Sequence, residues 1–212
     1  MTIFDLYEPF MRRFRGKRMA MFRDCLNPEE GAVILDVGGY APFWASSGLT
    51  KLRIICLNVH HVDAPPPGDI HFETVTGDGC KLEYPDTSFD IVFSNSVIEH
   101  VGDWDRQCAF AKEARRTGRR LWVQTPAYEF PVEPHYVAPF IHYLPKAVQR
   151  RVLRWLTPWG LLQKPSQEEI DEAVRTTRLL SKREMRLLFP DCEILTERFL
   201  GVLPKSYIAV RR

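Results

Sequence analysis

The chain has 212 residues, of which 45% are hydrophobic and 26% are charged. This apolar content is enough for one sizeable core, whereas the length is short for two ordinary domains and a linker, so we expect a single domain. The 29 lysines and arginines against 27 aspartates and glutamates give a formal net charge of +2. Such a balance lacks the strong basic excess of a dedicated nucleic-acid-binding domain, which speaks against a nucleic acid as the main partner.

The beginning of the chain and its cysteines indicate a soluble, reduced protein. Asp5 stands where a secretory signal would carry basic residues, and no later run of about eighteen uncharged apolar residues occurs, so we expect a cytoplasmic protein. The five cysteines are odd in number and form no C-x-x-C pair, which argues against a disulfide framework and a zinc knuckle. The adjacent pair His60-His61 lacks a third ligand, so the sequence predicts no metal site.

Short apolar runs bounded by breakers predict buried strands in the first part of the chain. In chain order they cover residues 32–37, 53–59, 71–76, 89–94 and 119–125. A helix is predicted over 104–117, because Asp103 can cap its start and Gly118 its end. Strands that alternate with helices in this way are typical of a parallel sheet with helical crossovers.

The last part of the chain changes this pattern. Ser181 and Glu184 form a predicted capping box that opens a short helix. Two more strands are predicted over 192–198 and 206–210, and residues 199–205 between them are too few for a crossover helix, so the two should pair antiparallel. We therefore expect one α/β domain with a seven-stranded mixed sheet, helices on both faces and an antiparallel last strand.

Two further segments accompany the predicted sheet. Residues 126–180 form an insertion far longer than an ordinary α/β connection, and insertions after a strand often carry substrate contacts. Near the N-terminus, a helix is expected to pack on the domain, with a flap over a ligand as the alternative. Its apolar face is Tyr7, Phe10, Met11 and Phe14.

The insertion contains two predicted helices. One starts at Pro145, with an apolar face made of Val148, Val152, Trp155 and Leu156, and a second is capped by Ser166 and Glu169. The first helix and the segment after it also carry Lys146, Arg150, Arg151, Arg154, Trp159, Leu161 and Leu162. We interpret this stretch as a lid whose apolar face packs inward, with contact to an anionic membrane or binding of a phosphorylated acceptor as the alternatives.

Polar residues and glycines follow the predicted strands. Asp36 lies near the end of the first strand and is followed by Gly38 and Gly39, which let a ligand approach the backbone closely, although a plain turn would also use them. Asn58 ends the second strand, where nucleotide-binding sheets hold ribose hydroxyls. Gly77-Asp78-Gly79 follows the third strand. At the end of the fourth strand the polar residues are Ser94, Asn95, Glu99 and His100.

This series of motifs resembles the class I S-adenosylmethionine-dependent methyltransferases. Asp36-Val37-Gly38-Gly39 resembles their glycine-rich first motif, and Ser88-Phe89-Asp90 their fourth-strand motif. The resemblance runs from about Val33 to Pro126 and resumes at Ser181. It implies a Rossmann-like fold and S-adenosylmethionine as cofactor. The implied cofactor residues are Asp36, Gly38 and Gly39 for the methionine part, Asn58 for ribose, Asp78 and Gly79 for adenine, and Ser94 and Asn95 for the reactive end.

The sequence departs from the family pattern in the same loop. Tyr40 and Pro42 occupy the positions of the second and third glycines, and Asn58 replaces the usual acid. These departures favour, as an alternative, a non-catalytic role as a methyltransferase-like partner protein.

Residues 130–145 resemble a stretch found in bacterial methyltransferases that act on small molecules or saccharide-containing products. Transfer to a hydroxyl requires alignment of the acceptor and removal of its proton, which suits a histidine. The candidate catalytic residues are His135, His142, Glu133 and His100. The alternative is that these polar groups hold a proline-rich loop together.

The expected organisation is one methyltransferase domain in four parts: an N-terminal helical cap (1–30), a cofactor-binding core (31–125), a substrate-capping insertion (126–180), and a C-terminal helix with two strands (181–212). The expected reaction is methyl transfer to an oxygen or nitrogen of a small-molecule or saccharide-type acceptor, with an RNA methyltransferase as a further alternative. The sequence leaves open whether the protein is a monomer or a homodimer.

Overall fold

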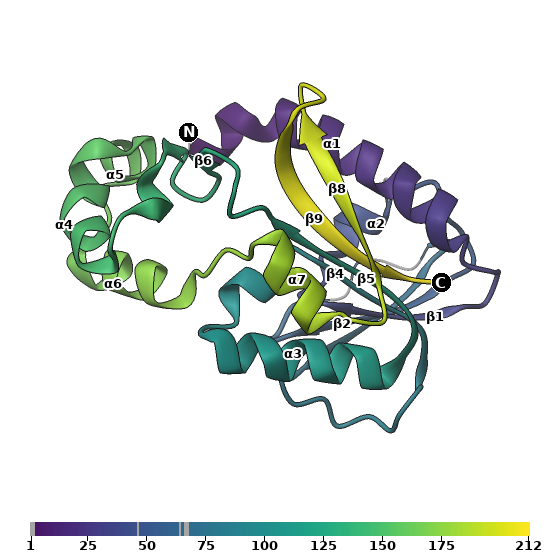
Figure 1. Ribbon diagram of the computed structural model, residues 1–212. Helices are drawn as coiled ribbons and strands as arrows, with labels where there is room; N and C mark the ends of the chain where they lie inside the picture. The colour runs from purple at the N-terminus through teal and green to yellow at the C-terminus, as the bar shows by residue number, and fades with distance from the viewer. Residues whose placement is uncertain (1–2, 46, 64, 66–67) are drawn as a thin grey trace.

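The computed structural model describes residues 3–45, 47–63, 65 and 68–212, and gives the backbone alone for 3–13, 15 and 45. One seven-stranded sheet runs through it in the order β3-β2-β1-β4-β5-β9-β8 (Figure 1). Its strands are β1 (Val33–Val37), β2 (Arg53–Asn58), β3 (His71–Thr76), β4 (Phe89–Asn95), β5 (Gly118–Pro126), β8 (Glu193–Phe199) and β9 (Leu203–Arg211). Strands β1 to β5 are parallel, and β9 lies antiparallel between β5 and β8. The predicted mixed sheet is confirmed.

Helices cover both faces of the sheet (Figure 1). One face carries α1 (Ile3–Leu26) and α2 (Ala41–Ala45), and the other carries α3 (Trp104–Thr117) and α7 (Lys182–Leu188). Successive strand residues point to opposite faces, so Ile34 packs in a buried cluster with Phe22 of α1, whereas the next residue, Leu35, packs in a cluster with Phe110 of α3 and Met185 of α7.

The predicted helix signals are observed. Helix α3 has the predicted bounds, and the Asp103 side chain accepts a hydrogen bond from the backbone of Arg106. The capping box of Ser181 and Glu184 opens α7. The first of the last two strands is shifted by one residue from its prediction and the second starts three residues earlier, so that only residues 200–202 connect them. These local signals are read reliably because capping satisfies backbone N–H groups within a few residues of sequence.

The insertion forms a separate helical layer beyond the sheet (Figure 1). Its elements are β6 (Val132–Glu133), β7 (Ala138–Pro139), the 3-10 helix η2 (Ile141–Tyr143), α4 (Lys146–Leu156), α5 (Pro158–Gln163) and α6 (Gln167–Thr176). It has its own buried cluster, which includes Leu153 and Ile170. Its two ends meet, because Ala127 and Leu180 form a parallel bridge and the N–H of Tyr128 donates to the Leu180 carbonyl at 3.0 Å.

The predicted apolar face of α4 is wrong. The buried residues of this helix are Gln149 and Leu153, whereas Trp155 and Leu156 are 67% and 70% exposed. Gln149 is accommodated inside because its side-chain amide donates to the carbonyl of Leu144 at 2.8 Å. A hydrophobicity pattern counts glutamine as outward-facing, and so it misplaces the buried side by one residue.

The structure describes only part of the predicted apolar face of the N-terminal helix. The side chains of Tyr7, Phe10 and Met11 lie outside the described residues, while Phe14 is half-buried with the ammonium of Lys205 3.0 Å from its ring centroid. Within the described part of the chain, no helix is long and apolar enough to cross a bilayer.

Candidate functional site

The strand order reverses between β1 and β4, since β2 lies on one side of β1 and β4 on the other. In open α/β sheets, ligands bind outside the carboxyl ends of the strands at such a point. The structure brings every predicted cofactor residue to this edge: Asp36, Gly38 and Gly39 at β1, Asn58 at β2, Asp78 and Gly79 after β3, and Ser94 and Asn95 at β4.

The loop after β1 requires both of its glycines. Gly38 has φ +76°, and a side chain there would overlap Val97. A Cβ on Gly39 would lie 2.9 Å from the carbonyl oxygen of Asp36 and from the sulfur of Cys56. The side-chain amide of Asn58 donates to the Gly39 carbonyl at 3.0 Å, so β2 holds this loop in place.

Asp36 is buried beneath the same loop. Its carboxylate accepts a hydrogen bond from the indole N–H of Trp44 at 2.6 Å, which fastens α2 to β1. Burial raises the pKa of Asp36 to about 7, against the hydrogen bonds from Trp44 and the backbone of Tyr40. Asp36 therefore supports the loop from inside.

Asp78 is paired with an arginine that the sequence gave no reason to expect. Both carboxylate oxygens accept hydrogen bonds from the Arg106 guanidinium, at 2.9 and 3.1 Å, and one also accepts from the backbone of Cys80. Partial burial opposes ionisation, but these hydrogen bonds outweigh it and lower the pKa of Asp78. Next to it, a Cβ on Gly79 would lie 2.7 Å from Val37, so Gly79 is packed too closely for a side chain.

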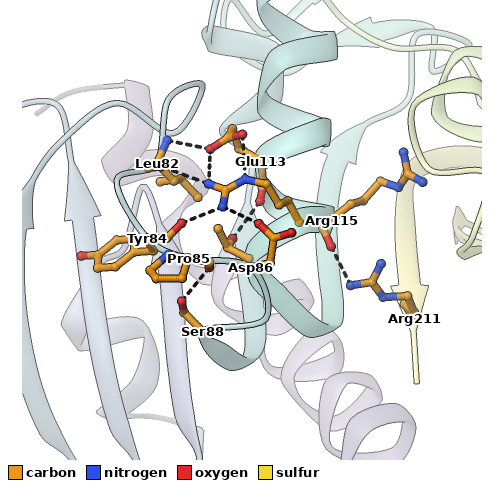
Figure 2. Close-up of polar contacts among 10 residues, drawn as sticks. Leu82, Tyr84, Pro85, Asp86, Ser88, Glu113, Arg115 and Arg211 are labelled. Carbon is orange, nitrogen blue, oxygen red and sulfur yellow. Dashed lines mark hydrogen bonds and ion pairs between the residues drawn. The ribbon is translucent and has the colours of Figure 1, made fainter.

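Arg116 fixes the segment that follows Asp78 on α3. Figure 2 shows Leu82, Tyr84 and Asp86 of this segment beside Glu113 of α3. The Arg116 guanidinium donates to the carbonyls of Leu82 and Tyr84 at 3.0 and 2.7 Å, and to the carboxylates of Asp86 and Glu113 at 2.9 and 2.7 Å. Arg116 thus anchors the later part of the connection from β3 to β4, whose start is held by Arg106 at Asp78.

The end of β4 is tied to the N-terminal helix. The Ser94 hydroxyl donates to the Val37 carbonyl at 3.1 Å, and the buried Arg18 of α1 donates to the Asn95 side chain at 2.6 Å. Arg18 also pairs with Glu197 of β8 at 2.8 Å. Sequence reasoning missed Arg18, because nothing distinguishes one arginine among the others of a basic helix.

A second group of polar residues lies where the insertion meets the 3-10 helix η1 (Ile98–His100). Nδ1 of His135 is 2.5 Å from one carboxylate oxygen of Glu133, and the other accepts from the backbone of Tyr136 at 2.7 Å. The His100 and His135 rings are 4.5 Å apart between centroids. Burial lowers the pKa of His135, but the hydrogen bond and charge of Glu133, with the charge of Glu99, outweigh it and raise the pKa.

Glu99 belongs to this group, although the sequence analysis did not select it as a candidate. It is fully buried, one carboxylate oxygen accepts from the Thr125 hydroxyl at 3.0 Å, and the other has no hydrogen-bond partner among the described residues. Burial raises the pKa of Glu99 to about 7. The sequence feature that could have identified Glu99 is its position beside His100 at the end of β4.

A cavity of about 960 Å³ opens between the insertion, α3 and α7. Glu133 and His142 line it, whereas His100, His135 and the predicted cofactor residues are not among the lining residues. Nε2 of His142 lies 3.0 Å from the carbonyl oxygen of Tyr128, and burial lowers the pKa of His142. The lining also contains the aromatic residues Trp104, Tyr128, Tyr136 and Tyr143 and the cations Lys146, Arg178 and Arg183.

Comparison with known proteins agrees with this architecture. Residues 49–120 match the methyltransferase domain family. A methyltransferase solved from Aquifex aeolicus is 16% identical, with 91% of this chain and 88% of that one covered and a TM-score of 0.50. A chain from the complex of the Haloferax volcanii Trm112 methyltransferase activator with a methyltransferase is 14% identical, with 99% and 97% covered and a TM-score of 0.54.

A third solved structure is the 1,6-didemethyltoxoflavin-N1-methyltransferase of Burkholderia thailandensis with 1,6-didemethyltoxoflavin and S-adenosylhomocysteine bound. It is 15% identical, with 92% of this chain and 76% of that one covered and a TM-score of 0.51. No curated protein matches the chain significantly in sequence. At these identities the solved structures show a common fold, and the family match is confined to residues 49–120. The findings together show a methyltransferase-domain match over residues 49–120, in a chain with the fold of solved S-adenosylmethionine-dependent methyltransferases.

Proposed function

We propose that the protein transfers a methyl group from S-adenosylmethionine to an oxygen or nitrogen of a small-molecule or saccharide-type acceptor held beneath the insertion. The observation that carries this proposal is the cavity between the insertion and the sheet domain, which is lined by Glu133, His142 and aromatic side chains. Its volume of about 960 Å³ falls in the range of small-molecule sites.

The edge at β1 and β4 fits the cofactor. Gly38 and Gly39 pack too closely against Val97 and Cys56 to carry side chains, and we assign the backbone of this loop to the methionine part of the cofactor. Asn58 is assigned to the ribose, Asp78 and Gly79 to adenine, and Ser94 and Asn95 to the reactive end. The bound cofactor supplies an electrophilic methyl group on a sulfonium, so the protein has to align the acceptor and take up its proton.

We assign to His142 the role of the general base that takes up the proton of the acceptor. The Tyr128 carbonyl can only accept a hydrogen bond, so Nε2 of His142 carries the hydrogen and Nδ1 carries the lone pair. Nδ1 is buried and has no hydrogen-bond partner among the described residues. Because its pKa is lowered, His142 is neutral at pH 7 and able to receive a proton, whereas Glu133, which also lines the cavity, is assigned to positioning the acceptor.

Two cations of the cavity favour an acceptor with an anionic group. Lys146 and Arg183 line the cavity, and neither has an acidic partner within the part of the chain that the structure describes. A phosphate or carboxylate on the acceptor would pair with them.

Calorimetric titration with S-adenosylhomocysteine, beside NAD as a control ligand, tests the cofactor site. We expect saturable binding of S-adenosylhomocysteine alone. Asn58→Ala should weaken it about fivefold to tenfold, the effect of one lost hydrogen bond, while the matched variant His142→Gln should leave it unchanged. Absence of binding, or equal loss in both variants, would refute the assignment and favour the non-catalytic alternative.

Transfer of labelled methyl groups into fractionated small molecules, saccharides and RNA then tests the acceptor. We expect labelled product in an anionic small-molecule or saccharide fraction. Labelling confined to RNA would contradict the proposal.

A further inference from the structure

Glu99, His100 and His135 bring three ligand atoms, one carboxylate oxygen and two imidazole nitrogens, within 4.8 Å of one another. We propose that these three residues bind a divalent zinc ion. A metal site of this kind goes beyond methyl transfer, and it has no sequence signature, since the ligands are separated by residues 101–134 and follow no ligand spacing.

The first supporting observation is the unpaired oxygen of Glu99. This carboxylate is fully buried, yet only one of its oxygens has a hydrogen-bond partner among the described residues, the hydroxyl of Thr125. A buried acceptor without a partner is costly, and such groups in native structures call for an explanation. Coordination of a cation would satisfy this oxygen.

The second observation is the support of His135 by Glu133. The 2.5 Å contact between the Glu133 carboxylate and Nδ1 places the ring proton on Nδ1 and leaves Nε2 free to bind a metal. Glu133 is itself held by the backbone N–H of Tyr136 at 2.7 Å. Histidines that bind metals usually donate their other ring N–H to a carboxylate or carbonyl in this way.

The ligand set indicates the type of ion. Two imidazoles and one carboxylate form the protein part of many catalytic zinc sites, in which a fourth position stays open for water or substrate. His100 is exposed, so an ion here would keep an open position towards solvent. Imidazole nitrogens make the site unsuited to Mg²⁺, which prefers oxygen ligands.

The site would join two parts of the molecule. Glu99 and His100 follow β4 of the sheet, whereas His135 lies between β6 and β7 of the insertion. A single hydrogen bond already links the far end of the insertion to the same place, from the N–H of Arg178 to the Glu99 carbonyl at 2.7 Å. The ion would fasten the start of the insertion as well.

The test uses the full-length protein freed of metal with a chelator and titrated with Zn²⁺ in competition with a chromophoric chelator. We expect one Zn²⁺ ion per chain and no competition from millimolar Mg²⁺. With Co²⁺ in place of Zn²⁺, we expect the absorption spectrum of a tetrahedrally coordinated ion. His135→Asn and His100→Asn should weaken binding by more than about 100-fold, and Glu133→Gln by about 10- to 100-fold. The control is His60→Asn with His61→Asn, an exposed pair, which should bind as the wild type does.

Equal Zn²⁺ affinity in wild type and His100→Asn would overturn the proposal, as would loss of binding in the control or displacement by Mg²⁺. His100 is exposed, so its variant stays informative even where a buried variant does not fold. Binding of S-adenosylhomocysteine, measured in the same preparations, reports separately on the methyltransferase assignment.

Discussion

Among single residues, Asp36 links the stability of the protein to pH. Its pKa is about 7 in the folded protein against an ordinary value of 3.8, so the folded state binds the proton more tightly than the unfolded state. Stability from this group is therefore present at low pH and is lost as the pH rises from about 4 to 7.

Asp36→Asn should remove this dependence, because asparagine still accepts the Trp44 hydrogen bond and does not ionise. The variant's free energy of unfolding, relative to wild type, should rise between pH 4 and 7 by at most about 1.4 kcal/mol per pH unit. Urea unfolding at a series of pH values measures this difference. A difference that stays constant with pH would show that Asp36 is ionised in the folded protein.

The lowered pKa of His142 predicts how the rate of the reaction depends on pH. Protonation removes the lone pair of Nδ1, and the lowered pKa places this loss below the usual histidine value of 6.5. The kcat/KM of wild type should therefore fall only on the acid side of that value. His142→Gln should reduce kcat by about 100-fold or more, and its profile should lack this limb. An unchanged acid limb in the variant would assign the proton to another group.

The residues found from the sequence and those missed differ in a physical way. Gly38, Gly39 and Asn58 follow strand ends, and parallel strands bring their carboxyl ends together, so order along the chain was enough to place them. Arg18 and Arg106 act through contacts between elements remote in sequence, Arg18 with Asn95 and Arg106 with Asp78. Such partners depend on how helices pack on the sheet, which periodicity does not specify.

At the scale of elements, the connection from β3 to β4 depends on Arg116. Arg116→Lys replaces a planar fork with a single ammonium, so several of the bonds to Leu82, Tyr84, Asp86 and Glu113 are lost. We expect a lower free energy of unfolding and a fall in Tm, which calorimetry measures.

Arg175→Lys is the matched control. Arg175 pairs with Glu172 on the exposed surface of α6, and such pairs contribute less than about 1 kcal/mol. Equal shifts in Tm for the two variants would mean that Arg116 does not anchor the loop.

Sequence patterns predicted the existence of the elements better than their faces. Helix α3 and the capping boxes at Ser166 and Ser181 are local features and are found as predicted. The buried side of α4 depends on α5 and α6, and on a hydrogen bond that lets Gln149 enter the interior. Tertiary packing therefore determines which residues of α4 are buried, and periodicity alone predicted the wrong side.

At the scale of the whole molecule, the insertion and the sheet domain have separate buried clusters. The predicted cofactor residues all lie outside the insertion. Replacing residues 128–179 with a short glycine–serine linker should therefore leave a folded sheet that binds S-adenosylhomocysteine, with a lower Tm because the packing of Phe130 on the core is lost. Acceptor methylation should be abolished. Calorimetry measures the binding of S-adenosylhomocysteine and the Tm, and circular dichroism measures the folded state. An unfolded product would show that the insertion is needed for folding.

The bridge between Ala127 and Leu180 has a consequence for how acceptor preference changes during evolution. Because the insertion leaves and re-enters the sheet at one place, a recombination event with both crossovers there exchanges the complete unit to which we assign acceptor recognition and disturbs no strand pairing of the sheet. The sheet domain, to which we assign the methyl donor, is inherited unchanged in such an exchange. The same two junctions give protein engineers a route to chimaeras in which one methyl-donor scaffold is combined with a library of recognition modules.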